Sequence, residues 1–123
     1  MEFRVEGLAI AAPLAMPGDA RRGERIVQDK GSSCVLCHSV PGAQGPMGNL
    51  APPLDGVGAR LGAGQLRLRL VDSTRINPGS IMPAYYRIEN LHQVAPAYRG
   101  KTLLDAQQIE DVVAYLLELK TAP

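Results

Sequence analysis

Apolar residues in the last part of the chain recur at the spacing of one face of an α-helix. The residues on this face are Ile109, Val112, Val113, Leu116 and Leu117. Asp105 stands just before them and Gln108 follows three positions later, which is the spacing of a capping box. Lys120 lies near the far end, where the helix dipole favours a cation. The pattern predicts a helix that begins near residue 105.

Two further segments of the chain have helical patterns. The first follows Asp19, a plausible N-cap, and continues through RRGERIVQDK to Gly31, a plausible C-cap glycine. The second spans residues 62–73, where leucine occupies every second position from 66 to 70, so a strand is the competing interpretation. No other segment resembles a strand, and no alternation of strands with helices occurs. We therefore predict an all-α domain.

Between the predicted helices lie two long segments rich in proline and glycine, residues 41–58 and 75–100. Structureless segments of this length are unusual in a compact domain, and they make sense if they surround something rigid. Aromatic residues, which usually fill much of a small core, make up only 4% of the 123 residues. A bound macrocycle would fill that interior. We expect an N-terminal extension over residues 1–17 and one domain over residues 18–123.

The charge pattern narrows the range of partners. The formal net charge is +1 and no basic block is present, so we expect no nucleic-acid partner. No apolar run approaches the roughly 20 residues of a membrane span. Residues 7–16 are mildly apolar, but Pro13 interrupts them and acidic residues precede them, which is unlike a signal peptide. We expect a mature or shortened chain.

The stretch GSSCVLCHSV, residues 31–40, holds both cysteines of the chain and one of its two histidines. A thioredoxin-like pair would follow a strand of an α/β sheet, whereas this pair follows a predicted helix. Zinc would need four ligands, and the only histidine outside the motif is the distant His92. The sequence Cys-x-x-Cys-His is the attachment motif of c-type haem. We predict one covalent haem c held by Cys34 and Cys37, with His38 as the proximal axial ligand of the iron.

The second axial position of a haem iron takes another ligand or stays open to a substrate. Met82, in the stretch SIMPAYY, lies well downstream of the motif, and Pro83 would fix the backbone beside it. We predict Met82 as the distal ligand. His92 is an alternative, and so is Met47, although Met47 lies only nine residues beyond His38 in a loop that the proximal side of the haem needs.

The stretch APPLDGVGAR, residues 51–60, resembles the Gly-Pro-x-Leu-x-Gly-x-x-Gly-Arg segment of small monohaem cytochromes c, with alanine in place of the first glycine. The resemblance implies that the carbonyl of Pro52 accepts the second ring N–H of His38. It also implies that Leu54 packs on the haem face and that Arg60 pairs with a haem propionate. A solvated loop charge is the alternative for Arg60.

The two terminal helices carry residues suited to a close crossing. A glycine such as Gly23 lets two helix backbones approach each other, because it has no side chain to keep them apart. The sequence predicts that Gly23 and Val27 of the first helix face the last helix at Val112, Tyr115 and Leu116. Crossed terminal helices with long loops around the haem are typical of the monohaem cytochrome c fold, which is the fold that we predict.

Five stretches of the sequence together resemble the SoxX-type sulfur-oxidation cytochromes c. They are PGDARRGERIV, CVLCH, APPLDGVGAR, LRLRLVDSTRINPGSIMPAYYR and VAPAYRGKTLLDAQQIEDVVAYLLELK. The similarity covers about residues 17–120, and INPGSIMPAYYR and APAYRGK in particular point to this family. The resemblance implies a periplasmic monohaem protein that pairs with a second cytochrome, SoxA.

The same resemblance implies a division of labour between the two cytochromes. SoxA carries the catalytic haem with a cysteine-derived ligand, and it joins thiosulfate oxidatively to a cysteine of a carrier protein. The present chain would accept the released electrons and pass them to a soluble cytochrome. It would then be the electron-transfer subunit of an L-cysteine S-thiosulfotransferase, and whether this chain alone has any activity stays open.

Two other functions remain open at this point. A freely diffusing electron carrier to an oxidase or another dehydrogenase would usually show a charged ring around its haem edge, and this near-neutral chain has no such block. A haem sensor would require Met82 to be weakly bound or absent from the iron. Tyr85 and Tyr86 could contact a partner near the haem edge, and packing in the core is an equal alternative for both.

Overall fold

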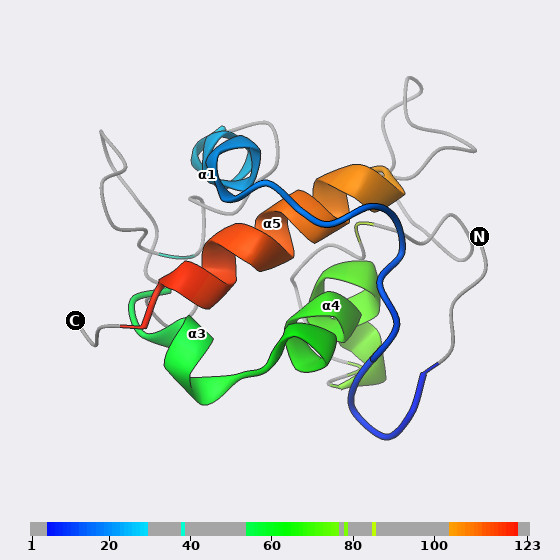
Figure 1. Cartoon of the computed structure of the whole chain (residues 1–123). Helices are drawn as coiled ribbons and strands as arrows, with labels where there is room; N and C mark the ends of the chain where they lie inside the picture. Colours follow the sequence, from blue (N-terminus) through cyan, green and yellow to red (C-terminus); the bar gives the residue numbers. More distant parts are fainter. Residues whose placement is uncertain are drawn as a thin grey trace.

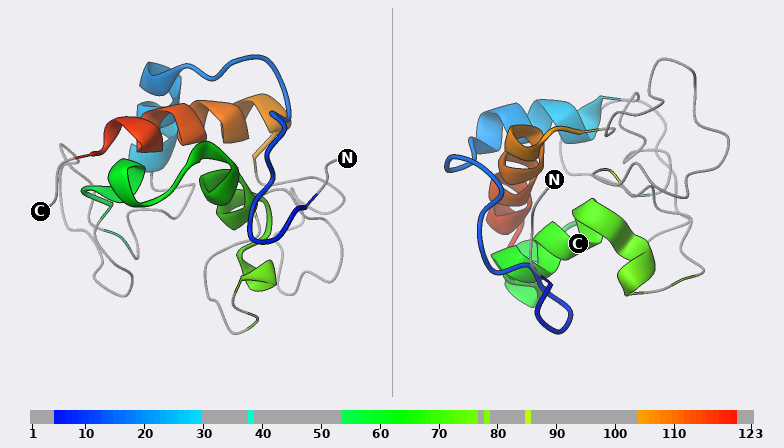
Figure 2. Two further views of the ribbon diagram at one scale, coloured as in Figure 1. Left: turned by 60° about the horizontal axis from the view of Figure 1, so that its bottom comes forward. Right: turned by 90° about the vertical axis from the view of Figure 1, so that its right-hand side faces the viewer.

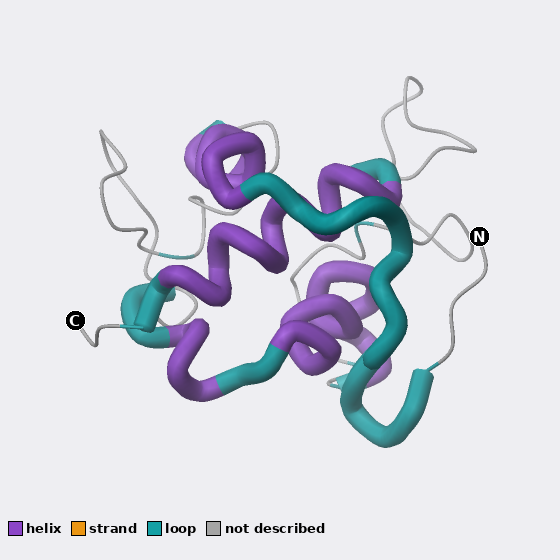
Figure 3. Tube along the Cα trace, in the orientation of Figure 1, coloured by secondary structure: helices purple, strands orange, loops and turns teal. Residues whose placement is uncertain are grey.

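The computed structural model describes residues 5–29, 54–76 and 104–120, together with His38, Pro78 and Tyr85. Its helices are α1 (Ala20–Gln28), α3 (Val57–Arg60), α4 (Ala63–Asp72), the short 3₁₀-helix η2 (Ser73–Arg75) and α5 (Ala106–Glu118). Within these described ranges there is no strand, only an isolated bridge between Glu6 and Ala9 (Figure 3). The predicted all-α class is confirmed.

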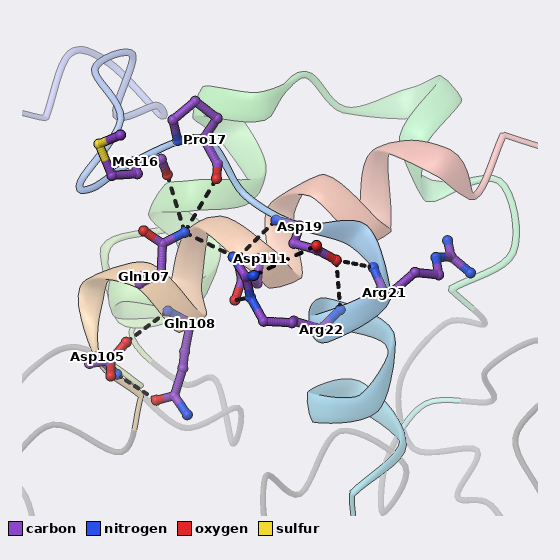
Figure 4. Close-up of polar contacts among 9 residues, drawn as sticks. All are labelled: Met16, Pro17, Asp19, Arg21, Arg22, Asp105, Gln107, Gln108 and Asp111. Carbon is purple, nitrogen blue, oxygen red and sulfur yellow. Dashed lines mark hydrogen bonds and ion pairs between the residues drawn. The ribbon is translucent and has the colours of Figure 1, made fainter.

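Side-chain caps set the beginnings of the two terminal helices, as the sequence predicts. The carboxylate of Asp19 accepts hydrogen bonds from the backbone N–H groups of Arg21 and Arg22, at 2.8 and 3.0 Å. At the start of α5, Gln108 N–H donates to Asp105 at 2.8 Å, and the Gln108 amide oxygen accepts from Asp105 N–H at 2.9 Å (Figure 4). Each cap satisfies N–H groups that have no partner inside the helix.

The predicted end of the first helix needs correction. The first helix ends at Gln28 and not at Gly31, because Asp29 takes an extended backbone conformation (φ −75°, ψ 124°). The Asp29 N–H closes the last turn by donating to the carbonyls of Arg25 and Ile26. The last helix, α5, ends at Glu118, so Lys120 lies just beyond it and near its C-terminal end, as predicted.

The segment with alternating leucines is the helix α4 and not a strand. Leu66, Leu68 and Leu70 are all buried, with exposed fractions of 3%, 0% and 3%. Arg67 and Val71 are buried as well, so α4 has protein around most of its circumference. A helix surrounded in this way carries apolar residues on several faces, and its pattern therefore loses the helical period.

The long C-terminal helix α5 is the centre of the packing. It lies between α1 on one side and α4 on the other, and the short α3 touches it near its C-terminal end (Figures 1 and 2). Among the described residues, the buried apolar side chains form one cluster, to which α5 contributes Ile109, Val112, Val113, Tyr115 and Leu116. None of the described helices is both long and apolar enough to cross a bilayer.

Glycines bring three segments against the backbone of α5. A Cβ on Gly23 of α1 would lie 1.9 Å from the carbonyl oxygen of Asp111 and 3.0 Å from Cβ of Tyr115. A Cβ on Gly18 would meet the Glu110 carbonyl at 2.0 Å, and one on Gly58 would meet the Leu117 carbonyl at 2.4 Å. The predicted close crossing of the terminal helices at Gly23 is confirmed.

The segment before α1 packs on the helices. It passes both α4 and α5, as Figure 1 shows for the dark blue part of the chain. Ile10 is fully buried in the core, and its N–H donates to the carbonyl of Gly64 at 2.9 Å. Leu14 N–H donates to the carboxylate of Glu110 at 3.1 Å. Residues of the predicted N-terminal extension thus form part of the core, and the domain boundary at residue 17 stays a prediction.

Candidate functional site

The residues predicted to hold the haem divide into two groups. Four of them lie outside the described residues: Cys34, Cys37, Pro52 and Met82. Three are described, namely His38, Leu54 and Arg60. His38 is half-buried. The donor set fits a covalent haem, because two thiols can form the thioethers and the adjacent imidazole is a common haem iron ligand.

Leu54 begins a short, tightly held segment. Its side chain is half-buried against the core, and its carbonyl accepts a hydrogen bond from Val57 N–H at 3.0 Å. Gly56 takes the left-handed conformation (φ 79°) that starts α3. Gly58 N–H then donates to the carbonyl of Leu119 at 2.9 Å. The segment after the predicted Pro52 position is therefore fixed to the C-terminal end of α5.

Arg60 ends this segment on the surface of the protein. Its Nη1 donates to the backbone carbonyl of Asp55 at 3.1 Å, which bends the side chain back over α3. A guanidinium has five N–H donors, so this bond leaves capacity for a further acceptor. The contact between Arg60 and a haem propionate stays a prediction.

Tyr85 is the described residue nearest in sequence to Met82. Its side chain is 2% exposed and belongs to the core cluster, so of the two alternatives for Tyr85 the structure supports core packing. Its N–H donates to the carbonyl of Leu70 at 3.0 Å, and its carbonyl accepts from Leu104 N–H at 3.0 Å. Tyr86 and the alternative iron ligands Met47 and His92 lie outside the described residues.

A buried ion pair between α4 and α5 is a feature that the sequence analysis missed. Arg67 and Glu110 form a bidentate pair, with Nε to Oε2 at 2.8 Å and Nη2 to Oε1 at 2.9 Å. Their side chains are only 5% and 4% exposed. Arg67 Nη1 also donates to the carbonyls of Ile10 and Ala11, at 2.7 and 3.2 Å. No sequence signal beyond a charged residue inside an apolar run marks either partner.

A second polar network surrounds the next residue of α5, Asp111 (Figure 4). Arg22 of α1 donates to its carboxylate from Nε at 2.9 Å and from Nη2 at 3.2 Å. Asp19 N–H and the Gln107 amide donate to the same carboxylate at 2.9 and 3.1 Å. The Gln107 amide also reaches the carbonyl of Met16 at 3.2 Å. The network joins α5 to α1 and to the segment that precedes it.

These contacts change the acidity of Asp111. Burial alone raises the pKa of the carboxyl group, but the hydrogen bonds from Arg22, Asp19 N–H and Gln107 outweigh burial and leave the pKa below its ordinary value of 3.8. The pKa of Asp19 is also lowered, chiefly by the N-cap hydrogen bond from Arg22 N–H. Within the described ranges, no group of three or more His, Cys, Asp or Glu side chains could hold a metal ion.

Comparison with known proteins agrees with this arrangement of helices and motif. The sequence model of the family described as Cytochrome c matches residues 20–120, which is most of the chain. The chain therefore belongs to the cytochrome c family, whose members carry a covalently bound haem c. No curated protein sequence gives a significant match.

A solved structure shows which type of cytochrome c the chain is. A chain of the crystal structure of SoxXA from P. pantotrophus matches with a TM-score of 0.85 and 36% sequence identity. The match covers 97% of the present chain and 95% of that chain. The protein is a SoxX-type cytochrome, and its function is electron transfer by haem c.

Proposed function

We propose that this cytochrome is the electron-accepting subunit of a periplasmic SoxAX complex that oxidises thiosulfate. The complex is an L-cysteine S-thiosulfotransferase, in which the SoxA haem joins thiosulfate to a carrier cysteine. The present chain takes the released electrons and passes them to a soluble cytochrome. The observation that carries this proposal is the likeness to the SoxXA crystal structure over 97% of the chain.

The residues of this chain hold the haem and set its properties. Cys34 and Cys37 would hold the haem through thioethers, and His38 and Met82 would bind its iron. When bound, the haem supplies an iron that gains and loses one electron. Ligation by histidine and methionine raises the reduction potential of such an iron, which suits an acceptor of electrons from sulfur chemistry.

Three nearby residues support the haem in this proposal. The Pro52 carbonyl would accept the ring N–H of His38 and so fix the tautomer and orientation of the imidazole. Leu54 would pack on the haem face. Arg60 pairs with a propionate through guanidinium donors that its bond to the Asp55 carbonyl leaves available. The fixation of residues 54–60 on α5 favours these roles, since a rigid segment holds its side chains in place.

The iron ligands and cysteines of the chain favour electron transfer over sulfur chemistry at this haem. With His38 and Met82 both bound to it, the iron would have no position left for thiosulfate. The chain has two cysteines, and both stand in the haem motif, so no third thiol can carry a sulfane sulfur. Bond formation on sulfur therefore takes place on the partner.

Reconstitution tests this function directly. The purified chain alone should give no thiosulfate-dependent modification of carrier thiols, and addition of SoxA should restore the coupling. Coupling by the isolated chain, or full coupling by SoxA without it, would contradict the proposal.

The alternative is a freely diffusing carrier that serves an oxidase or another dehydrogenase. Purification from the native periplasm, with mass spectrometry of the proteins that accompany the chain, separates the two functions. The subunit should bring SoxA with it in a fixed ratio at physiological salt. A diffusing carrier should elute alone.

A further inference from the structure

Tyr85 is held at both of its backbone polar groups. Its N–H bonds to Leu70 near the end of α4, and its carbonyl bonds to Leu104, which stands just before the N-cap of α5. Both distances are 3.0 Å. Leu70 is among the last four residues of its helix, where carbonyl groups lack a donor within the helix and need one from elsewhere. Tyr85 thus satisfies a helix end and joins two helices.

The side chain of Tyr85 adds a third restraint. It is 2% exposed, and it belongs to the same core cluster as Leu70 and Leu104, which are 3% and 6% exposed. The packed ring resists rotation of the residue about its two hydrogen bonds. Position and orientation of the backbone at Tyr85 are therefore both fixed by the helical core.

This fixed point lies close to Met82 along the chain. Met82 is outside the described residues, but covalent geometry keeps its Cα within about 11 Å of the Tyr85 Cα, because one residue spans at most about 3.6 Å. Ordering each freely moving residue costs roughly 1–2 kcal/mol of conformational entropy. A methionine on a short tether therefore reaches its ligand position at a lower entropic cost than one on a free loop.

We propose that Tyr85 is a positioning residue for the axial sulfur of Met82. It acts by anchoring the chain three residues beyond the ligand to both α4 and the start of α5. The inference rests on the proposed function, in which Met82 binds the iron. A loosened anchor leaves the haem attached through the cysteines but lowers the occupancy of the sulfur on the iron.

The test compares two tyrosines that are equally buried. Tyr85 and Tyr115 are 2% and 3% exposed, but Tyr115 packs at the crossing of α1 and α5 beside Gly23. The haem-loaded proteins Tyr85→Ala and Tyr115→Ala are compared with the unchanged protein. The readouts are the far-red band from sulfur to ferric iron, the reduction potential, the rate of azide binding to ferric iron, and thermal unfolding.

We expect Tyr85→Ala to weaken the far-red band, lower the potential and speed azide binding about tenfold, the change that ~1.4 kcal/mol of lost sulfur binding produces. Tyr115→Ala should lower the unfolding temperature about as much as Tyr85→Ala does, but it should leave the three haem readouts unchanged. Tyr85→Phe keeps the ring and the backbone bonds, so its haem readouts should match those of the unchanged protein. If either alanine variant does not fold, Tyr85→Leu and Tyr115→Leu give the same comparison with less lost volume.

Two results would overturn the inference. One is a Tyr85 variant with an unchanged band, potential and azide rate. The other is an equal loss of the band in the Tyr85 and Tyr115 variants, which would reflect general destabilisation. Met82→Ala, with the exposed Met16→Ala as its control, tests the ligand itself. If Met82→Ala keeps the band, the ligand assignment fails. If it loses the band while Tyr85→Ala does not, only the positioning role fails.

Discussion

Two neighbouring acidic residues of α5 form ion pairs in different surroundings. Glu110 pairs with Arg67 of α4, and both side chains are buried beneath the segment that contains Ile10. Asp111 pairs with Arg22 of α1, and although Asp111 is 3% exposed, Arg22 is 50% exposed. Consecutive residues on a helix point in directions about 100° apart, so the two carboxylates contact different neighbouring helices.

The contribution of each ion pair to the stability of the fold depends more on the surroundings of the pair than on the pair itself. If Arg22 is removed, water reaches the edge of the site and two other donors still bind Asp111. If Arg67 is removed, the carboxylate of Glu110 is left buried with the Leu14 N–H as a remaining donor. A buried charge without its partner is far more costly than a partly hydrated one.

The largest expected effect is on the buried pair. Arg67→Met should lower the free energy of unfolding by about 3–5 kcal/mol, because it leaves Glu110 uncompensated and frees the carbonyls of Ile10 and Ala11. Denaturant titration of the haem-loaded protein measures this. The double variant Arg67→Met with Glu110→Gln should recover part of the loss. Strictly additive losses would show that the two side chains are not coupled, contrary to this account.

The next effect concerns the close approach of α1 to α5. Gly23→Ala would place a Cβ 1.9 Å from a backbone carbonyl oxygen, so the two helices must move apart. We expect a loss of about 1–3 kcal/mol in unfolding free energy, which is typical of overpacking. Gly62→Ala is the matched control, because its nearest neighbour would be the Gln65 side chain at 3.8 Å. Equal losses in both variants would mean that glycine content, and not the crossing, determines the cost.

The smallest effect is expected at the half-exposed pair. Arg22→Ala should have little effect on the free energy of unfolding at neutral pH, since exposed pairs contribute little. The more telling readout is acid unfolding. Because the folded pKa of Asp111 lies below 3.8, the stabilisation that its ionised form provides is fully present above that value and is lost as the pH falls through the folded pKa.

The same variant therefore changes the pH profile. Without Arg22 the pKa of Asp111 should rise, and acid unfolding should begin at a higher pH than in the unchanged protein. Arg21→Ala is the control, because Arg21 lies on the same helix and pairs with the half-buried Glu24 and the exposed Glu118. Equal shifts for both variants would indicate a general effect of net charge and would contradict the specific role of Arg22.

Local sequence signals made the helices predictable, whereas contacts between residues far apart in the sequence could not be predicted. Asp19 and the pair Asp105 and Gln108 cap their helices as predicted, because capping depends on residues three or fewer positions apart. The pairing of Arg67 with Glu110 spans 43 residues and leaves no local pattern. The short helix α3 was missed for a related reason, since its four residues depend on hydrogen bonding to the end of α5.

The candidate site follows the same division. The haem motif is contiguous, so its chemistry could be predicted from residues 34–38 alone. Met82 was inferred from its place in the chain and remains a prediction. The burial of Tyr85 depends on its contacts with α4 and the start of α5, so the sequence left core packing and partner binding as equal alternatives.

The most direct test of the relay role is the oxidation state of this haem during turnover. Stopped-flow spectra would be recorded after thiosulfate is mixed with the carrier protein, SoxA and the oxidised chain. The account predicts that the haem of this chain becomes reduced as thiosulfate is consumed, and that it stays oxidised when SoxA is omitted. If the haem stays oxidised while coupling proceeds at full rate, the relay role is wrong and the freely diffusing carrier becomes the better explanation.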